Sequence, residues 1–146
     1  KGIFLLSNEA GKKTYPETLH KKITTAEGAS STQPSKRIRP IDRDIASAKH
    51  RFLFYCGSGN IHKGLHMVLE AFASLPQAEL YICTKIEDDF AQAFHTSLFE
   101  TPNIHVMGHI RPYGRTFRQL MKDCLWLIFP SASEGSPGSV ADCMIQ

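Results

Sequence analysis

A lysine and a glutamate, each beside a turn of small residues, are the side chains of this sequence best suited to chemistry. Lys63 follows the turn Gly57, Ser58 and Gly59, and Glu134 lies in a Ser- and Gly-rich turn after an apolar run. Glycines let the backbone approach a ligand closely, and an ammonium group at a helix entrance meets a phosphate as a point charge. The first turn has neither the Walker P-loop order nor the GxGxxG order. It indicates either an anion site or an ordinary glycine turn beside a surface lysine.

The turn that carries Glu134 leads into the start of a helix. Pro137 suits the first helical position and Ser136 suits the N-cap, so the first N–H groups of this helix are free to meet an anion. Asp142 lies roughly one to two turns inside the helix. The alternative is that Glu134 only accompanies the helix dipole and that Asp142 is a solvated surface residue.

Alternating strand and helix patterns supply the elements that must position these side chains. Apolar runs predict strands at Phe52–Cys56, Leu80–Cys83, Ile104–Met107 and Leu125–Phe129. Helical spacing predicts helices at Lys63–Leu75, Glu87–Phe99 and Thr116–Asp123 and from Pro137 onward. This order predicts an α/β fold, a Rossmann-like parallel sheet with helices on both faces.

Ligands of such sheets bind beyond the carboxyl ends of the strands. The loops that follow the predicted strands begin at Gly57, Thr84, Gly108 and Ser131. We therefore expect these loops on one rim, with the lysine and the glutamate beside it. Trp126, inside the last predicted strand, is expected in the core.

The chain divides by composition near residue 50. Residues 1–50 carry predicted strands at Ile3–Leu6 and Ile23–Thr25 and a linker at Gly28–Pro40, and we interpret them as an N-terminal segment and linker. Residues 51–146 form the Rossmann-like domain. We expect this domain to be truncated, because its last helix has neither a C-cap nor a following strand.

The totals favour a globular protein of a reducing compartment. Hydrophobic residues make up 42% and charged residues 21% of the 146 residues, and the net charge of +3 is too small to imply nucleic acid. Basic residues do cluster in Lys36–Arg51, either as a solvated linker or as a polyanion patch. The four cysteines form no CxxC pair, which argues against a zinc ribbon. The N-terminal apolar run is too short for a signal peptide or a membrane span, so we expect the cytoplasm.

No metal site is expected. His62 and His66 are spaced to share a helix face but lack the glutamate of an HExxH motif, and no DxD motif occurs. Surface or core positions are expected for the other histidines.

Several motifs in order make residues Phe52–Met144 resemble a known domain. They are FLFYCGSGNIHKGLHMVLEAF, then NIHVMGHI, then LWLIFPSASEGSPGSVADCM. This series resembles the C-terminal, donor-binding domain of retaining glycosyltransferases of the GT-B type, the family often called group 1. The resemblance implies a single GT-B half. The N-terminal SNEAGKKTY also resembles a segment near the domain junction of some relatives, which implies that residues 1–50 are left from such a junction.

The resemblance also implies roles for individual residues. Lys63 would contact the donor diphosphate, and Glu134 would contact hydroxyls of the transferred sugar, so both are candidate catalytic residues. Asp142 stands where relatives have a glutamate that holds the ribose, and Ser58 stands where relatives often have an arginine. The implied donor-binding set is Gly57, Ser58, Gly59, Lys63, Gly108, His109, Ile110, Ser133, Glu134, Gly135, Ser136, Gly138, Ser139 and Asp142.

The function implied is transfer of a sugar from a nucleoside-diphosphate sugar to a glycan or glycolipid acceptor, with retention and without metal or cofactor. The full-length protein would be a hexosyltransferase of polysaccharide biosynthesis, and it would associate peripherally with the inner face of the membrane. The acceptor would bind through an N-terminal domain absent from this sequence. We therefore expect the fragment alone to be inactive, with no nucleic-acid partner.

Three alternatives stay open. One is another enzyme of the same architecture, such as a nucleotide-sugar epimerase or a phosphorylase. Another is a non-catalytic, response-regulator-like or scaffold α/β module, which would place an acidic cluster at the strand ends. The third is a nucleic-acid binder that uses Lys36–Arg51, which steep salt dependence would reveal.

Overall fold

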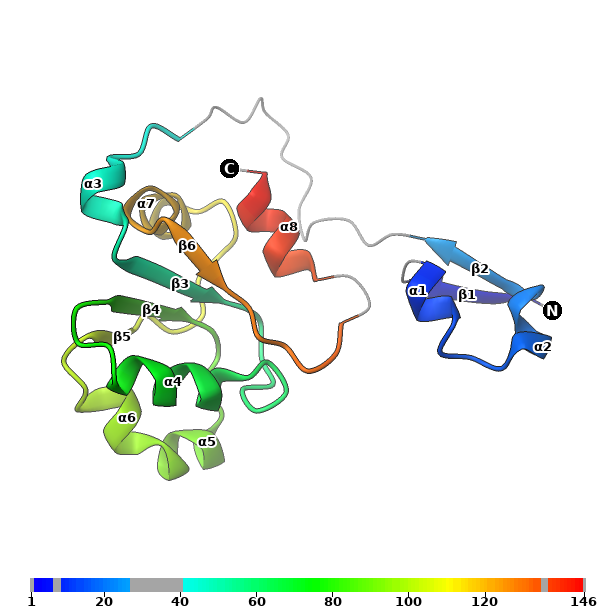
Figure 1. Ribbon diagram of the computed structural model, residues 1–146, viewed down its shortest axis with the longest axis horizontal. Coiled ribbons are helices and arrows are strands. Elements are labelled where there is room, and N and C mark those ends of the chain that lie inside the picture. The colour runs from blue at the N-terminus through cyan, green and yellow to red at the C-terminus, as the bar shows by residue number, and fades with distance from the viewer. Residues whose placement is uncertain (1, 7–8, 27–40, 135–136, 146) are drawn as a thin grey trace.

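The central sheet confirms the predicted α/β architecture. The computed structural model describes residues 2–6, 9–26, 41–134 and 137–145 (Figure 1). Its larger sheet is parallel throughout and has the strand order β5-β4-β3-β6. These strands are β3 (Arg51–Tyr55), β4 (Glu79–Cys83), β5 (Ile104–Val106) and β6 (Trp126–Ile128).

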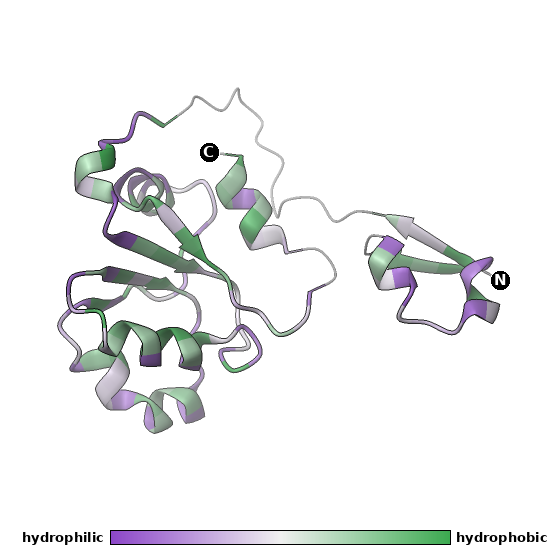
Figure 2. Ribbon diagram, viewed as in Figure 1, coloured by the Kyte–Doolittle hydropathy of each residue, from purple (hydrophilic) through white to green (hydrophobic). Residues whose placement is uncertain are grey.

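Apolar runs place the strands because the central strands are covered on both faces. In the register, Leu53 of β3 lies between Tyr81 of β4 and Leu127 of β6. Successive side chains of a strand point to opposite faces, so a strand buried on both faces is apolar without alternation. Leu53 and Phe54 are both almost completely buried, one on each face. The strands are accordingly coloured mostly as hydrophobic in Figure 2.

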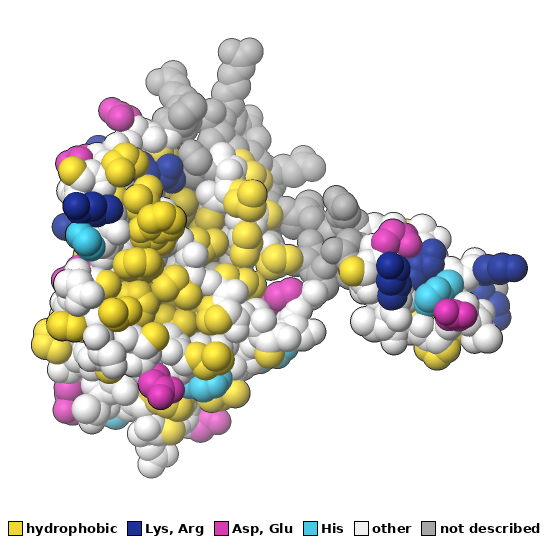
Figure 3. Space-filling model, in the orientation of Figure 1, with side chains coloured by type: hydrophobic (Ala, Val, Ile, Leu, Met, Phe, Trp, Pro, Cys, Tyr) yellow, Lys and Arg dark blue, Asp and Glu magenta, His cyan; other side chains and the backbone are white. Residues whose placement is uncertain are grey.

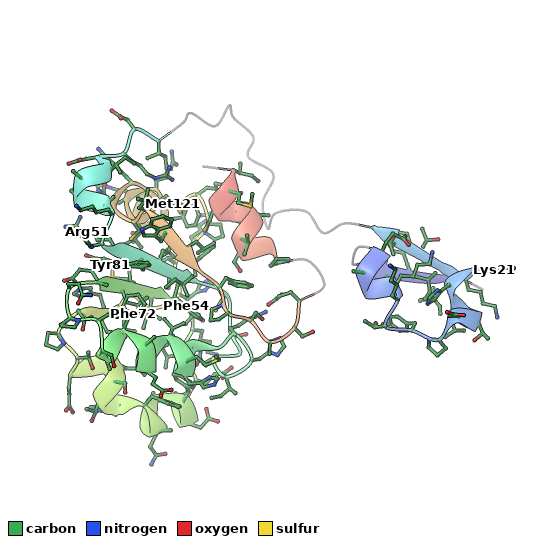
Figure 4. All side chains as sticks on the ribbon, in the orientation of Figure 1. Lys21, Arg51, Phe54, Phe72, Tyr81 and Met121 are labelled. Carbon is green, nitrogen blue, oxygen red and sulfur yellow. The ribbon has the colours of Figure 1, made fainter. Side chains whose placement is uncertain are left out.

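Helices cover both faces of this sheet, as predicted. On one face lie α4 (Leu65–Ala73), α5 (Asp88–Ala93) and α6 (His95–Phe99), and on the other α3 (Ile45–Ala48), α7 (Arg115–Asp123) and α8 (Gly138–Met144) (Figure 1). Phe54 and Phe72 belong to the core on the α4 side, and Met121 to the core on the α7 side (Figure 4).

Two of the predicted helices on the α4 side of the sheet differ from the observed ones for physical reasons. The helix predicted at Glu87–Phe99 is two helices, because Phe94 leaves the helical conformation with φ −115° and ψ 25°. Its ring stacks on Phe90 with centroids 4.4 Å apart. The first helix after β3 begins at Leu65 rather than Lys63, because Gly64 is left-handed with φ 74°.

Trp126 is the main error in the predicted core. Its side chain is 51% exposed, because β6 is an edge strand among the described strands and Trp126 lies at its first position. The indole N–H donates to the carbonyl oxygen of Lys49 at 3.0 Å, and the ring stacks on Phe52. Hydrophobic side chains gather on the face of the sheet domain shown in Figure 3.

The N-terminal segment contains a small sheet of its own. The predicted strands are confirmed as β1 (Ile3–Leu6) and β2 (Ile23–Ala26), which pair in parallel with Ile3 opposite Ile23. Between them lie the short helices α1 (Glu9–Lys12) and α2 (Glu17–His20).

The four cysteines are buried free thiols. Burial raises the pKa of Cys83, Cys124 and Cys143 to about 12, so these thiols are uncharged at neutral pH and act as small core side chains. None of the described helices is both long enough and apolar enough to cross a membrane.

Candidate functional site

The structure brings Lys63 and Glu134 into direct contact. Lys63 lies in the loop between β3 and α4, and Glu134 lies in the loop that follows β6. The ammonium group of Lys63 donates to Oε1 of Glu134 in an ion pair that joins residues 71 positions apart in the sequence. Their side chains are only 19% and 23% exposed. The carboxyl rim of the sheet thus holds a cation and an anion together.

Hydrogen bonds keep the Glu134 carboxylate charged. Ser131 Oγ donates to Oε1 of Glu134 at 2.6 Å. Burial by itself would raise the pKa of Glu134, but the bonds from Lys63 and Ser131 and the charge of Lys63 outweigh it and hold the pKa below its ordinary value. Lys63 also lies 5.7 Å from the ring centroid of Phe129, within the range of a cation–π interaction.

The loops that carry Lys63 and Glu134 are fastened side by side. The backbone N–H of Ala132 donates to the carbonyl oxygen of His62 at 3.0 Å. The His62 ring nitrogen Nε2 lies 2.9 Å from the carbonyl oxygen of Ser133. His62, weighed in the sequence only as a metal ligand, therefore contacts the loop that carries Glu134.

Gly64 lets the two loops approach this closely. A Cβ at Gly64 would lie 2.5 Å from the carbonyl oxygen of Pro130 and 3.0 Å from its Cγ. Because the backbone there also has a positive φ of 74°, the position needs glycine for both space and conformation. In the sequence, the glycine directly after Lys63 is the sign that this position needs glycine.

The glycine turn itself already holds an anion from the chain. The backbone N–H of Gly59 donates to Oε1 of Glu87 at 3.0 Å, and that of Asn60 donates to Oε2 at 3.3 Å. Gly57 and Ser58 are exposed on the same turn, and the carbonyl of Gly57 accepts from the Thr84 hydroxyl at 3.0 Å. The N–H of Gly59 is thus already bonded within the chain. Contacts of this turn with a nucleoside-diphosphate sugar stay predictions.

Asn60 and Glu87 form a clasp that the sequence did not reveal. Asn60 is completely buried; its Nδ2 donates to the carbonyl of Lys85 at 3.0 Å, and its Oδ1 accepts from the N–H of Glu87 at 2.9 Å. Glu87 is the N-cap residue of α5, and its carboxylate bonds the glycine turn rather than the start of its own helix. This contact fixes the loop that leads to Lys63.

We expect Glu87→Ala to lower the free energy of unfolding by about 1–3 kcal/mol, because it leaves two partly buried N–H groups without their acceptor. The measurement is urea denaturation of the variant and the wild type. Asp88→Asn is the matched control, because it removes a carboxylate next to Glu87 on the exposed start of α5. Equal effects of the two changes would contradict the clasp.

The loop after β5 offers mainly backbone to a ligand. Gly108 has a positive φ of 71° and open space where a Cβ would lie. The side chain of Ile110 is buried in the core beside α7, and His109 is exposed. These positions lie on the rim as predicted, and their contact with a donor stays a prediction.

Asp142 is buried rather than solvated. It is 1% exposed and accepts a hydrogen bond from the Tyr113 hydroxyl at 2.9 Å, so the surface interpretation is wrong. Tyr113 holds a positive φ of 58°. Burial first and the Asp142 charge second raise the pKa of Tyr55. The ribose-holding role of Asp142 stays a prediction.

The helix start after Glu134 differs from the prediction. Pro137 is the N-cap, with φ −77° and an extended ψ of 92°, and the helix begins at Gly138. The N–H groups of Val140 and Ala141 donate to the Pro137 carbonyl, so those of Gly138 and Ser139 come before the first intrahelical bond. Ser133 is exposed, whereas Gly135 and Ser136 lie outside the described residues.

A cavity of about 880 Å³ lies against the fastened loops. Its lining includes His62, Gly64 and Met67, together with Pro130 and Ala132 of the loop after β6. Among the residues that the structure describes, no group of three or more His, Cys, Asp or Glu side chains is placed to hold a metal ion.

Comparison with known proteins identifies the fold. No model of a known protein family matches the chain, and no curated protein matches it. A solved structure is similar: the crystal structure of Anabaena Alr3699/HepE in complex with UDP and glucose, with a TM-score of 0.67 and 15% sequence identity. The two share a fold. The similarity covers 99% of this chain but 42% of HepE, so the chain spans less than half the length of that protein.

Proposed function

We propose that this chain is the nucleotide-sugar-binding part of a glycosyltransferase. One observation carries the proposal: the Lys63–Glu134 pair lies where ligands of such sheets bind. In the parallel order β5-β4-β3-β6, β4 and β5 are added on one side of β3 and β6 is added on its other side, so the order of strand addition reverses between β3 and β6. Lys63 follows β3 and Glu134 follows β6, so the pair spans this switch point. The fold shared with HepE, which was crystallised with UDP and glucose, supports the same proposal.

The charges of the pair suit sugar transfer. The bond between the anomeric carbon and the diphosphate oxygen breaks, and the nucleoside diphosphate leaves with the bonding electrons. The oxygen of an acceptor hydroxyl bonds to the carbon, and its proton passes to the departing diphosphate. Lys63 stabilises the negative charge that develops on the diphosphate. Glu134, which is ionised, accepts hydrogen bonds from sugar hydroxyls.

The finer assignments of the proposal come from the sequence resemblance. They are membership of the retaining group 1 family, retention of configuration, no metal or cofactor, and a glycan or glycolipid acceptor of polysaccharide biosynthesis. The acceptor would bind to a part of the protein outside this chain. The full-length enzyme would then work in the cytoplasm at the inner face of the membrane, and this chain alone would bind donor without turnover.

Calorimetric titration of the folded protein with UDP, GDP and ADP tests the proposal. We expect one diphosphate to bind at least about tenfold more tightly than its nucleoside, because hydrogen bonds to charged groups contribute about 1.5–3 kcal/mol. Circular dichroism must show that the titrated sample is folded. A folded sample that binds none of the three nucleotides overturns the proposal.

A further inference from the structure

The side chain of His62 bonds the loop that carries Glu134, at the residue directly before Glu134. The backbone bond from the Ala132 N–H to the His62 carbonyl lies one residue farther from Glu134. The Ser131 hydroxyl bonds Glu134 but belongs to the same loop. The imidazole of His62 reaches across from the Lys63 loop to the carbonyl of Ser133, the residue before Glu134.

The chemistry of this contact fixes its direction. A carbonyl oxygen only accepts hydrogen bonds, so the Nε2 of His62 must carry the hydrogen. At 2.9 Å from a carbonyl oxygen, the tautomer that fits this contact is the one with the hydrogen on Nε2. The bond therefore exists whenever the ring has its Nε2–H, and a side chain without a donor at that place loses it.

We propose that His62 is a positioning residue that holds Glu134 against Lys63 and thereby sets how well the site distinguishes a sugar diphosphate from a bare diphosphate. The inference rests on the proposed function. Lys63 follows His62 directly in the chain. One peptide segment therefore carries both the residue that binds the diphosphate, Lys63, and the residue that anchors Glu134, which binds the sugar. Loss of the anchor frees Glu134 to move while Lys63 keeps its own backbone position.

The anchor is tested first without any ligand. Hydrogen exchange of the amides of residues 131–134 is compared in wild type, His62→Ala and His62→Gln. We expect severalfold faster exchange in His62→Ala and near wild-type exchange in His62→Gln, because the glutamine amide nitrogen reaches about as far as Nε2 and donates. Unchanged exchange in His62→Ala would overturn the anchor.

The effect on ligands is tested by calorimetry with the pair that wild type binds: UDP and UDP-glucose, GDP and GDP-mannose, or ADP and ADP-glucose. In His62→Ala we expect the ratio of the two affinities to fall about 3- to 10-fold, the equivalent of one net hydrogen bond, with the bare diphosphate bound within about twofold of wild type. His62→Gln should restore the ratio. His95→Ala is the control, because His95 is an exposed histidine on α6 that pairs only with Glu100 among its described ion pairs.

The outcomes separate the two proposals. Wild type that binds no nucleotide overturns the proposed function, and the exchange experiment still decides whether His62 anchors the loop. Wild type that binds both ligands, with a ratio in His62→Ala no lower than in His95→Ala, overturns the positioning role alone. An equal loss for both ligands also overturns it, because loosening Glu134 removes a contact with the sugar and none with the diphosphate.

Discussion

Replacing Gly64 with alanine is expected to lower the free energy of unfolding by about 3 kcal/mol or more, the range of the largest single-residue effects. The left-handed backbone, with φ 74°, costs an L-residue about 1–2 kcal/mol. The new Cβ would also lie 2.5 Å from the Pro130 carbonyl oxygen. That atom is backbone and cannot rotate away, so the two loops must separate. Thermal denaturation should show the loss as a fall in Tm of about 10 °C or more.

Two other glycines of the rim separate the causes of this effect. Gly108→Ala adds a Cβ in open space at φ 71°, so it should cost only the conformational term of about 1–2 kcal/mol. Gly57→Ala adds a Cβ in open space where φ is not positive, and should cost less than about 0.5 kcal/mol. If Gly64→Ala is no worse than Gly108→Ala, the contact with Pro130 does not fasten the loops.

The sheet was predictable because its central strands are buried on both faces. A run such as FLFY can be apolar throughout only where helices cover both sides, and the alternation with helical spacing then dictates a parallel order. The errors lie where tertiary contacts override local pattern. Trp126 is exposed because its strand lies at an edge of the sheet, and the break at Phe94 has no local breaker residue such as Gly or Pro that would predict it.

The sequence predicts where the site lies, at the carboxyl rim of the sheet, but not the contacts that hold its loops together. Parallel strands bring their carboxyl ends together, so the sequence predicts that Lys63 and Glu134 lie close to each other, and the two form an ion pair. The Glu87 carboxylate in the glycine turn was not predictable, because the contact joins loops 28 residues apart and has no local pattern. The same holds for His62 and Ser133, which are 71 residues apart and meet where Gly64 lets Pro130 approach.

Neutralising Lys63 and neutralising Glu134 should change diphosphate binding in opposite directions. In the ligand-free protein the two charges satisfy each other. We expect Lys63→Met to weaken the bound diphosphate about 10- to 100-fold, the value of a charged hydrogen bond, without affecting the nucleoside. Lys85→Met is the control, because it removes an exposed positive charge from the neighbouring loop after β4. Calorimetry measures the affinity of each variant for the nucleoside, the diphosphate and the sugar diphosphate.

Glu134→Gln should bind the bare diphosphate more tightly. The change removes a negative charge that repels phosphate and competes for the Lys63 ammonium group, and partly exposed pairs are worth about 0.2–1 kcal/mol, so the gain is about 1.5- to 5-fold. The same variant should lose the extra affinity that the sugar supplies. Acid should act like this substitution: the lowered pKa of Glu134 keeps the pair intact at and above its ordinary value of 4.5, and the pair is lost as the pH falls through the folded-state pKa.

The double variant shows whether the two residues act on phosphate through each other. If Glu134 competes for Lys63, then Glu134→Gln has much less effect on diphosphate binding once Lys63 is methionine, because only the repulsion between charges remains. Weaker diphosphate binding in Glu134→Gln would contradict the competition. It would mean that Glu134 holds Lys63 in place for phosphate, so the ion pair at the rim would be a support for the cation rather than its rival.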